Sequence, residues 1–78
     1  MRKKSLKLII SFNTTNDALF CDSLCMNNSI KGRLIPVPRE ISAGCGHAYM
    51  TEPENKESIL KLFEDNDIMY EEIRIMLY

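Results

Sequence analysis

The sequence predicts an α+β fold with its elements in the order strand, helix, strand, strand, helix, strand. Two segments, 6–12 and 68–77, alternate apolar and polar residues at the period of a strand. A segment with helix-start residues and an apolar stripe follows the first strand, and another precedes the last strand. The middle of the chain carries prolines typical of an edge strand. A chain of 78 residues makes one domain, residues 1–78, with a modest core.

The first strand and helix follow from side-chain spacing and capping. A half-buried strand is predicted because one face gathers Leu6, Leu8, Ile10 and Phe12. Thr14 or Thr15 can cap the next helix, and Asp17 favours the exposed amides of its first turn. Residues 18–26 supply an apolar stripe, and the polar residues 27–29 indicate where the helix ends.

The middle of the chain predicts two strands joined by a loop. The second strand runs over residues 32–37, and its Pro36, followed by Pro38, cannot donate ladder hydrogen bonds. This strand is therefore expected at a sheet edge. A loop over 39–46 leads to a short third strand near 47–51.

The last third of the chain predicts a helix and a strand. Pro53 suits the first turn of a helix that runs to about Asn66, with a buried face of Ile59, Leu62 and Phe63. The last strand, roughly 68–77, points Ile73, Ile75 and Leu77 one way and Glu72 and Arg74 the other.

This order of elements is the split βαβ, or ferredoxin-like, arrangement, with two helices on one face of a four-stranded antiparallel sheet. The other face is expected to show Ile9, Met76 and Tyr49, which is more apolar surface than a monomer usually exposes. We therefore expect a homodimer, formed through that face or by pairing of sheet edges.

Composition narrows the class of protein. Ten Lys and Arg against eleven Asp and Glu lack the cationic excess that non-specific phosphate binding requires, so nucleic acid is not an expected partner. No export signal follows the basic start, and no apolar run is long enough for a membrane span. Three cysteines, an odd number, fit a reducing compartment, so we expect a cytoplasmic protein with a free thiol.

The stretch from Ile41 to Gly46 carries the candidate chemistry. Cys45 lies between Gly44 and Gly46, which allow unusual backbone angles and the close approach of another molecule. Cations and backbone amides favour the thiolate, and the nearby sequence supplies Arg39, Arg33 and His47 for this purpose. The alternative is that the two glycines only shape a hairpin and that the cysteine is incidental.

The other two cysteines and the glycines give little indication of a metal or cofactor site. Cys21 and Cys25 share one helix face and could join Cys45 in a metal site, but cysteines in an apolar stripe are more often core residues, which keeps their thiols protonated and slow to react. The glycines match neither phosphate-binding pattern, so we expect no metal and no nucleotide or other cofactor.

The segment RLIPVPREISAGCG, residues 33–46, closely resembles the signature of the Se/S carrier-like family of small bacterial proteins. The segment FNTTNDAL, residues 12–19, resembles the family's strand end and first helix start. The resemblance implies that sulfur or selenium is transferred as a persulfide or selenosulfide on Cys45. His47 stands where the family usually has an aliphatic residue, and Cys21 and Cys25 are not part of the signature.

The expected function is thus a carrier rather than a turnover enzyme, with a donor such as a cysteine desulfurase and an acceptor protein as partners. Two alternatives remain open. A non-catalytic binding or regulatory module predicts that Cys45→Ser leaves function intact. A thiol redox or metal-delivery protein predicts reversible pairing of Cys45 with Cys21 or Cys25, or stoichiometric metal.

Overall fold

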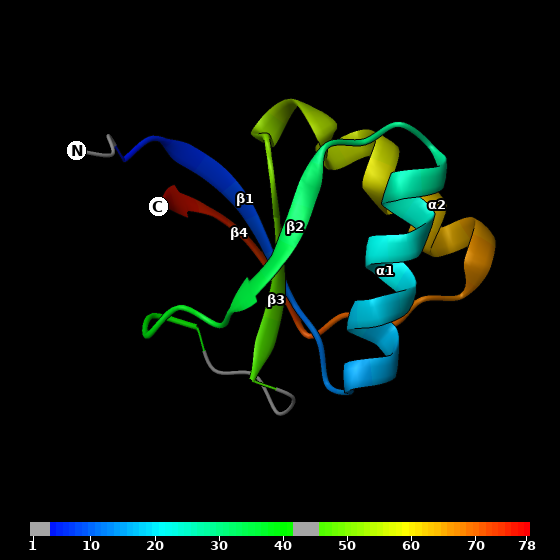
Figure 1. The fold of residues 1–78 in the computed structure, drawn as a ribbon, viewed down its shortest axis with the longest axis horizontal. Helices are drawn as coiled ribbons and strands as arrows, with labels where there is room; N and C mark the ends of the chain where they lie inside the picture. The colour runs from blue at the N-terminus through cyan, green and yellow to red at the C-terminus, as the bar shows by residue number, and fades with distance from the viewer. Residues whose placement is uncertain (1–3, 42–45) are drawn as a thin grey trace.

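The elements lie in the predicted order. The computed structural model describes residues 4–41 and 46–78. It contains β1 (Leu6–Ser11), α1 (Thr15–Asn27), β2 (Gly32–Pro36), β3 (His47–Thr51), the 3₁₀ turn η1 (Pro53–Asn55), α2 (Lys56–Asn66) and β4 (Glu72–Leu77). The strands form one antiparallel sheet in the order β2-β3-β1-β4, and both helices cover one face (Figure 1). The ferredoxin-like α+β prediction is confirmed.

Two local predictions are confirmed by hydrogen bonds and strand order. The Thr14 hydroxyl caps α1 by accepting from the backbone N–H of Asp17 at 3.2 Å. Strand β2 lies at a sheet edge, and Pro36 is its last residue. The missing N–H of this proline is therefore tolerated.

The main core lies between the helices and the sheet. Leu8 and Ile10 of β1 and the following Phe12 meet Ile59 and Phe63 of α2, and the Phe12 and Phe63 rings touch edge to face with centroids 6.0 Å apart. Two expected members are missing from this core: Leu6 is exposed at the start of β1, and Leu62 is only half-buried.

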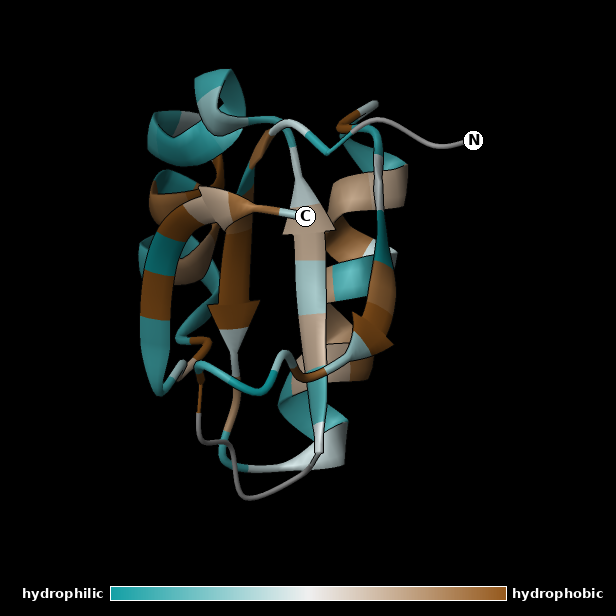
Figure 2. Cartoon of the chain, turned by 90° about the vertical axis from the view of Figure 1, so that its left-hand side faces the viewer, coloured by the Kyte–Doolittle hydropathy of each residue, from teal (hydrophilic) through white to brown (hydrophobic). Residues whose placement is uncertain are grey.

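The expectation that the second sheet face is open was wrong. The segment 37–41 crosses that face after β2 (Figure 2), and a second cluster forms there from Ile9, Ile35, Ile41, Ala48 and Met50. Ile9 is 0% exposed, and Met76, which does face this side, is partly buried. Strand β1 is therefore buried on both faces and not half-buried, because it is a central strand with cover on each side.

Tyr49 also lies on the other face from the one expected. It pairs with Ile10, and directly opposite residues share a face, so its ring packs in the core beneath the helices. Its neighbours Ala48 and Met50 face the second cluster. Alternation could not predict the face of Tyr49, because both faces of β3 are apolar.

Strand β4 begins at Glu72, four residues later than the predicted Ile68. Asp67 adopts the left-handed conformation at the end of α2, with φ 54°. The N–H of Ile68 then bonds the Phe63 carbonyl at 3.0 Å, and its side chain is buried in the main core. Ile68 thus belongs to the helix end rather than to the strand.

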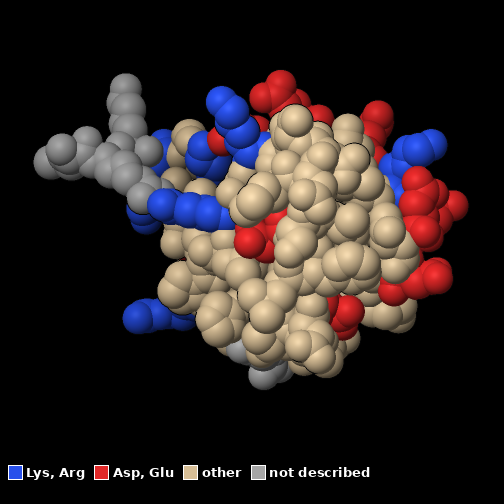
Figure 3. Space-filling model, turned by 45° about the vertical axis from the view of Figure 1, so that its right-hand side comes forward, with Lys and Arg blue, Asp and Glu red and all other residues tan. Residues whose placement is uncertain are grey.

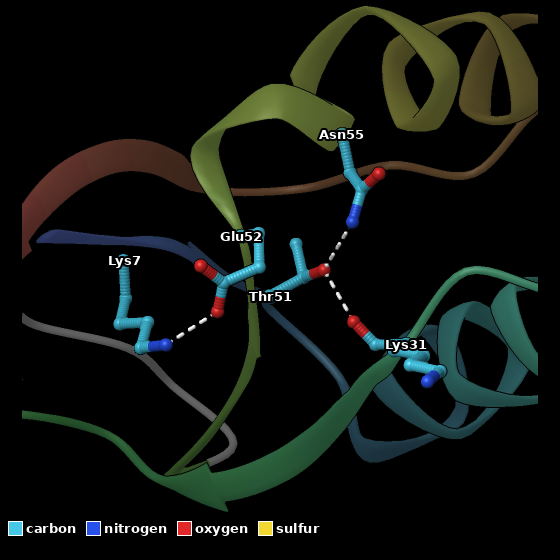
Figure 4. A network of polar contacts seen from close by, with 5 residues as sticks. All are labelled: Lys7, Lys31, Thr51, Glu52 and Asn55. Atoms are coloured by element: carbon cyan, nitrogen blue, oxygen red, sulfur yellow. Dashed lines mark hydrogen bonds and ion pairs between the residues drawn. The ribbon is translucent and has the colours of Figure 1, made fainter.

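A small polar network joins the chain segments at the end of β3 (Figure 4). The Thr51 hydroxyl donates to the Lys31 carbonyl at 2.6 Å and accepts from the Asn55 amide at 2.9 Å. Next to it, Lys7 of β1 forms an ion pair with Glu52. Thr51 is 2% exposed, so these bonds satisfy its buried hydroxyl and tie η1 to the start of β2.

In the part of the chain that the structure describes, no helix is long and apolar enough to cross a membrane.

Candidate functional site

The residues on either side of the predicted carrier thiol are held in place, whereas Cys45 and Gly44 themselves lie outside the described residues. The N–H of Val37 donates to the carbonyl of Gly46 at 3.1 Å, which extends the pairing of β2 with β3 by one step. The N–H of Ile41 donates to the carbonyl of Pro38 at 3.0 Å and closes a tight turn.

The turn is fixed to the sheet by one apolar and one polar contact. Ile41 is 4% exposed and packs in the second cluster with Ile9. Arg74 of β4 donates from Nη1 to the Glu40 carbonyl at 3.2 Å and also forms an ion pair with Glu72. The segment 37–41 is therefore held against the central and the far edge strands.

Gly46 supports the prediction that this loop uses glycine for its backbone freedom. Its φ is +75°, a conformation that L residues rarely adopt, while nothing lies within 4 Å of the place a Cβ would take. Glycine is thus required there by backbone conformation and not by lack of space.

Arg39 lies beside a cleft and not in a buried pocket. It lines, with Lys4, a cleft of about 470 Å³ whose other walls are Pro38, Glu40, Met76, Leu77 and Tyr78. Both cations lack an ion pair within the described residues. In Figure 3 basic side chains lie mainly on the side of the N-terminus, and acidic ones gather on the opposite side, along α2. The cleft thus offers unpaired positive charge next to an apolar floor.

The other two candidates for the thiolate environment lie on β2 and β3. Arg33 is exposed and pairs with Met50, so it shares the face that the segment 37–41 crosses. His47 is exposed at the start of β3, opposite Pro36. The structure therefore places Arg33 on the face of the sheet that is crossed by the segment carrying Arg39.

The two helical thiols are buried beneath the sheet, as predicted, at 0% and 1% exposure. The pKa of Cys21 is raised, because its S–H donates to Cys25 and because it is buried. The expectation that burial would also raise the pKa of Cys25 was wrong. The pKa of Cys25 is lowered, because its sulfur accepts hydrogen bonds from Cys21 and, second, from the Tyr49 hydroxyl, which outweigh burial.

Sequence reasoning missed the part that Tyr49 and Gly32 play around these thiols. A Cβ on Gly32 would lie 2.5 Å from the Tyr49 hydroxyl oxygen and 2.6 Å from the Met50 carbonyl oxygen. The glycine at the start of β2 therefore makes room for the hydroxyl that reaches Cys25. Burial and the bond to Cys25 raise the pKa of Tyr49 in turn.

A metal site finds no support in the part of the chain that the structure describes, where no three His, Cys, Asp or Glu side chains cluster to hold an ion. A site that includes Cys45 would lie partly outside that part.

Residues 7–74 match the family model described as "Putative Se/S carrier protein-like". No curated protein and no solved structure gives a significant match. The matched region includes both helices, β2 and β3 in full, all of β1 except Leu6, and the first half of β4. The chain therefore belongs to the Se/S carrier protein-like family.

Proposed function

We propose that this protein carries a sulfur or selenium atom on the thiol of Cys45, as a persulfide or selenosulfide, and passes it to an acceptor protein. The observation that carries the proposal is the family match over residues 7–74, within which Cys45 is the cysteine of the loop signature. The anchored segments on either side, 37–41 and Gly46, support it, because a carrier thiol needs a loop fixed at its base and open to a second protein.

The transfer is an exchange at sulfur that needs no added oxidant. The Cys45 thiolate attacks the outer sulfur of a donor persulfide, the new S–S bond forms, and the donor cysteine leaves as a thiolate. The proton on the outer sulfur stays there, and the oxidation level of the transferred atom does not change. An acceptor nucleophile repeats the step on the loaded Cys45, which returns as a thiolate. The chain is thus a carrier and not a turnover enzyme.

The positive charge beside the loop suits both the thiolate and its partners. Arg39 and Arg33 are exposed cations on the face that the loop base crosses, and cations lower the pKa of a nearby thiol. We infer that the donor, a cysteine desulfurase or its selenium counterpart, presents an acidic surface to the cleft of Lys4 and Arg39. Because such exchange requires reduced thiols, we propose that the protein acts in the cytoplasm.

Sulfur loading of defined cysteine variants tests the proposal. After incubation with a cysteine desulfurase and cysteine, the intact mass of the wild-type chain should rise by about 32 Da, or by about 80 Da with a selenium donor. Cys45→Ser should abolish the adduct, while Cys21→Ser and Cys25→Ser serve as matched controls that keep it, because those side chains are buried. An adduct that persists in Cys45→Ser would show that the carrier assignment is wrong.

A further inference from the structure

Strand β4 forms an unprotected edge of the sheet. Among the strands of the described residues, in the order β2-β3-β1-β4, it has a neighbour, β1, on one side only. The opposite edge, β2, ends in Pro36 and is followed by Pro38, which blocks further pairing, whereas the six residues of β4 contain no proline. Figure 2 shows β4 at the side of the sheet, with hydrophobic and hydrophilic residues alternating along it.

The hydrogen-bonding direction of each β4 residue follows from the ladder with β1. Ser5 and Tyr78 exchange both backbone hydrogen bonds, at 3.0 and 3.4 Å. In an antiparallel pair such residues alternate, so Met76 and Arg74 also bond toward β1. The N–H and C=O groups of Ile73, Ile75 and Leu77 therefore point outward, toward the space where a fifth strand would lie.

The same three residues carry the apolar side chains of β4 that face the helix side of the sheet. Ile75 pairs with Leu8 and Ile73 with Ile10, so all three lie on the helix side of the sheet. Helix α1 contacts β2 and β3. Ile73 is partly buried against the main core, whereas the apolar residues beyond it along β4 are exposed. Ile75 is 45% exposed, Leu77 59% and the adjacent Leu6 57%. Outward hydrogen-bonding groups and exposed apolar side chains thus coincide along one strand.

We propose that β4 pairs antiparallel with β4 of a second copy of this chain, with Ile75 opposite Ile75 of the partner subunit on a two-fold axis. Ile73 then lies opposite the partner's Leu77, and Leu77 opposite the partner's Ile73. The three pairs exchange about six backbone hydrogen bonds, two for each pair. On the helix side of the sheet every apolar side chain of the strand meets an apolar one, which is the self-complementarity that a two-fold interface requires.

Other registers also let Ile73, Ile75 and Leu77 bond to the partner strand. Charge repulsion and the loss of apolar contacts disfavour those registers. A shift that places Ile73 opposite the partner's Ile75 brings Arg74 directly opposite Arg74 of the partner subunit, which is unfavourable. A shift the other way leaves Ile73 without an apolar partner. In the proposed register Arg74 lies opposite the partner's Met76 and keeps its own ion pair with Glu72.

The resulting dimer is a continuous eight-stranded sheet that ends at both β2 edges, so its prolines stop further growth. Since opposite residues share a face, the helices of both copies lie on one side. Both clefts of Lys4 and Arg39 lie on the other side, next to the axis. This assembly does not depend on the carrier role of Cys45.

Sedimentation equilibrium of the full chain tests the pairing. The wild-type protein should sediment at twice the 9.0 kDa mass of one chain at micromolar concentration. Ile75→Lys places two cations on the axis and should raise the dissociation constant by at least about tenfold, with an unchanged circular dichroism spectrum. Met26→Lys is the matched control, because Met26 is also exposed and apolar, at 71%, but lies on α1. It should remain a dimer.

A cross-link keeps the test independent of folding effects. In a Cys45→Ser background, Ile75→Cys should form a disulfide-linked dimer on mild oxidation, because the two sulfur atoms face each other across the axis. Met26→Cys should not. A wild-type monomer at every concentration, an Ile75→Lys dimer of unchanged affinity, or equal cross-linking at positions 26 and 75 would each overturn the proposal.

Discussion

At the scale of single residues, a small number of close contacts decide what the sequence alone leaves open. Cys21 and Cys25 look equivalent in sequence, four positions apart on one helix. Their environments differ because Cys21 donates the hydrogen bond between the two thiols, whereas the sulfur of Cys25 accepts it and also accepts from the Tyr49 hydroxyl. Tyr49 comes from a strand more than twenty positions away, so helix spacing could not predict the difference.

We predict that Gly32→Ala destabilises the fold by about 1–3 kcal/mol, in the range of overpacking substitutions. The new Cβ would lie 2.5 Å from the Tyr49 hydroxyl oxygen and 2.6 Å from a backbone carbonyl, neither of which can move freely. Urea unfolding measures the change, with Arg33→Ala as the exposed neighbouring control. Equal stability of Gly32→Ala and wild type would mean that the Tyr49 ring is not held against β2.

At the scale of elements, the segment 37–41 has the most consequence for function. Its sequence, with one proline and two charged residues among five, resembles an ordinary loop. In the structure it covers one face of the sheet through Ile41 and is bonded to β4 through Glu40. The base of the Cys45 loop is thus part of the core packing, not only a connection between two strands.

We predict that Ile41→Ala and Ile35→Ala destabilise the protein by similar amounts, about 2–5 kcal/mol, since both side chains are 4% exposed in the same cluster. Only Ile41→Ala should also slow sulfur loading of Cys45, because Ile41 holds the loop base and Ile35 lies within β2. The loading rate, measured by intact mass under conditions where both variants are folded, distinguishes them. Equal loading rates in the two variants would show that the packing of Ile41 has no specific effect on the loading of Cys45.

At the scale of the whole molecule, the buried thiols link stability to pH. The pKa of Cys21 is raised above its ordinary 9.0 in the folded state, so above that value the unfolded chain releases a proton that the folded chain keeps. Tyr49 acts in the same direction above its ordinary 10.0. Cys25, with its lowered pKa, adds stability as pH rises toward 9.0 and nothing further above it.

We therefore predict that the free energy of unfolding falls as pH rises above about 9, with a contribution from Cys21 of up to about 1.4 kcal/mol per pH unit. Urea unfolding at several pH values between about 8 and 10 measures the slope. Cys21→Ala should make this slope shallower, by the amount that corresponds to about one proton fewer released on unfolding. The buried control Ala18→Gly should change the free energy of unfolding but not its slope against pH. An unchanged slope in Cys21→Ala would show that another group causes the pH dependence.

The sequence by itself determined the order of elements, the capped first helix, the edge position of β2 and the family. These features depend on local signals: periodicity in 6–12, the capping hydroxyl of Thr14, and the missing donor of Pro36. The Cys45 loop could also be identified in this way, because its signature is contiguous over residues 33–46.

Only the tertiary structure decided which apolar residues are covered. Ile9 and Tyr49 were predicted on an open face, yet Ile9 is covered by the segment 37–41 and Tyr49 by the helices. Strands β1 and β3 are apolar on both faces, so side-chain alternation carries no information about which face is inside. That information comes from contacts between distant segments, which cover the second sheet face but leave apolar side chains exposed at the edge of β4.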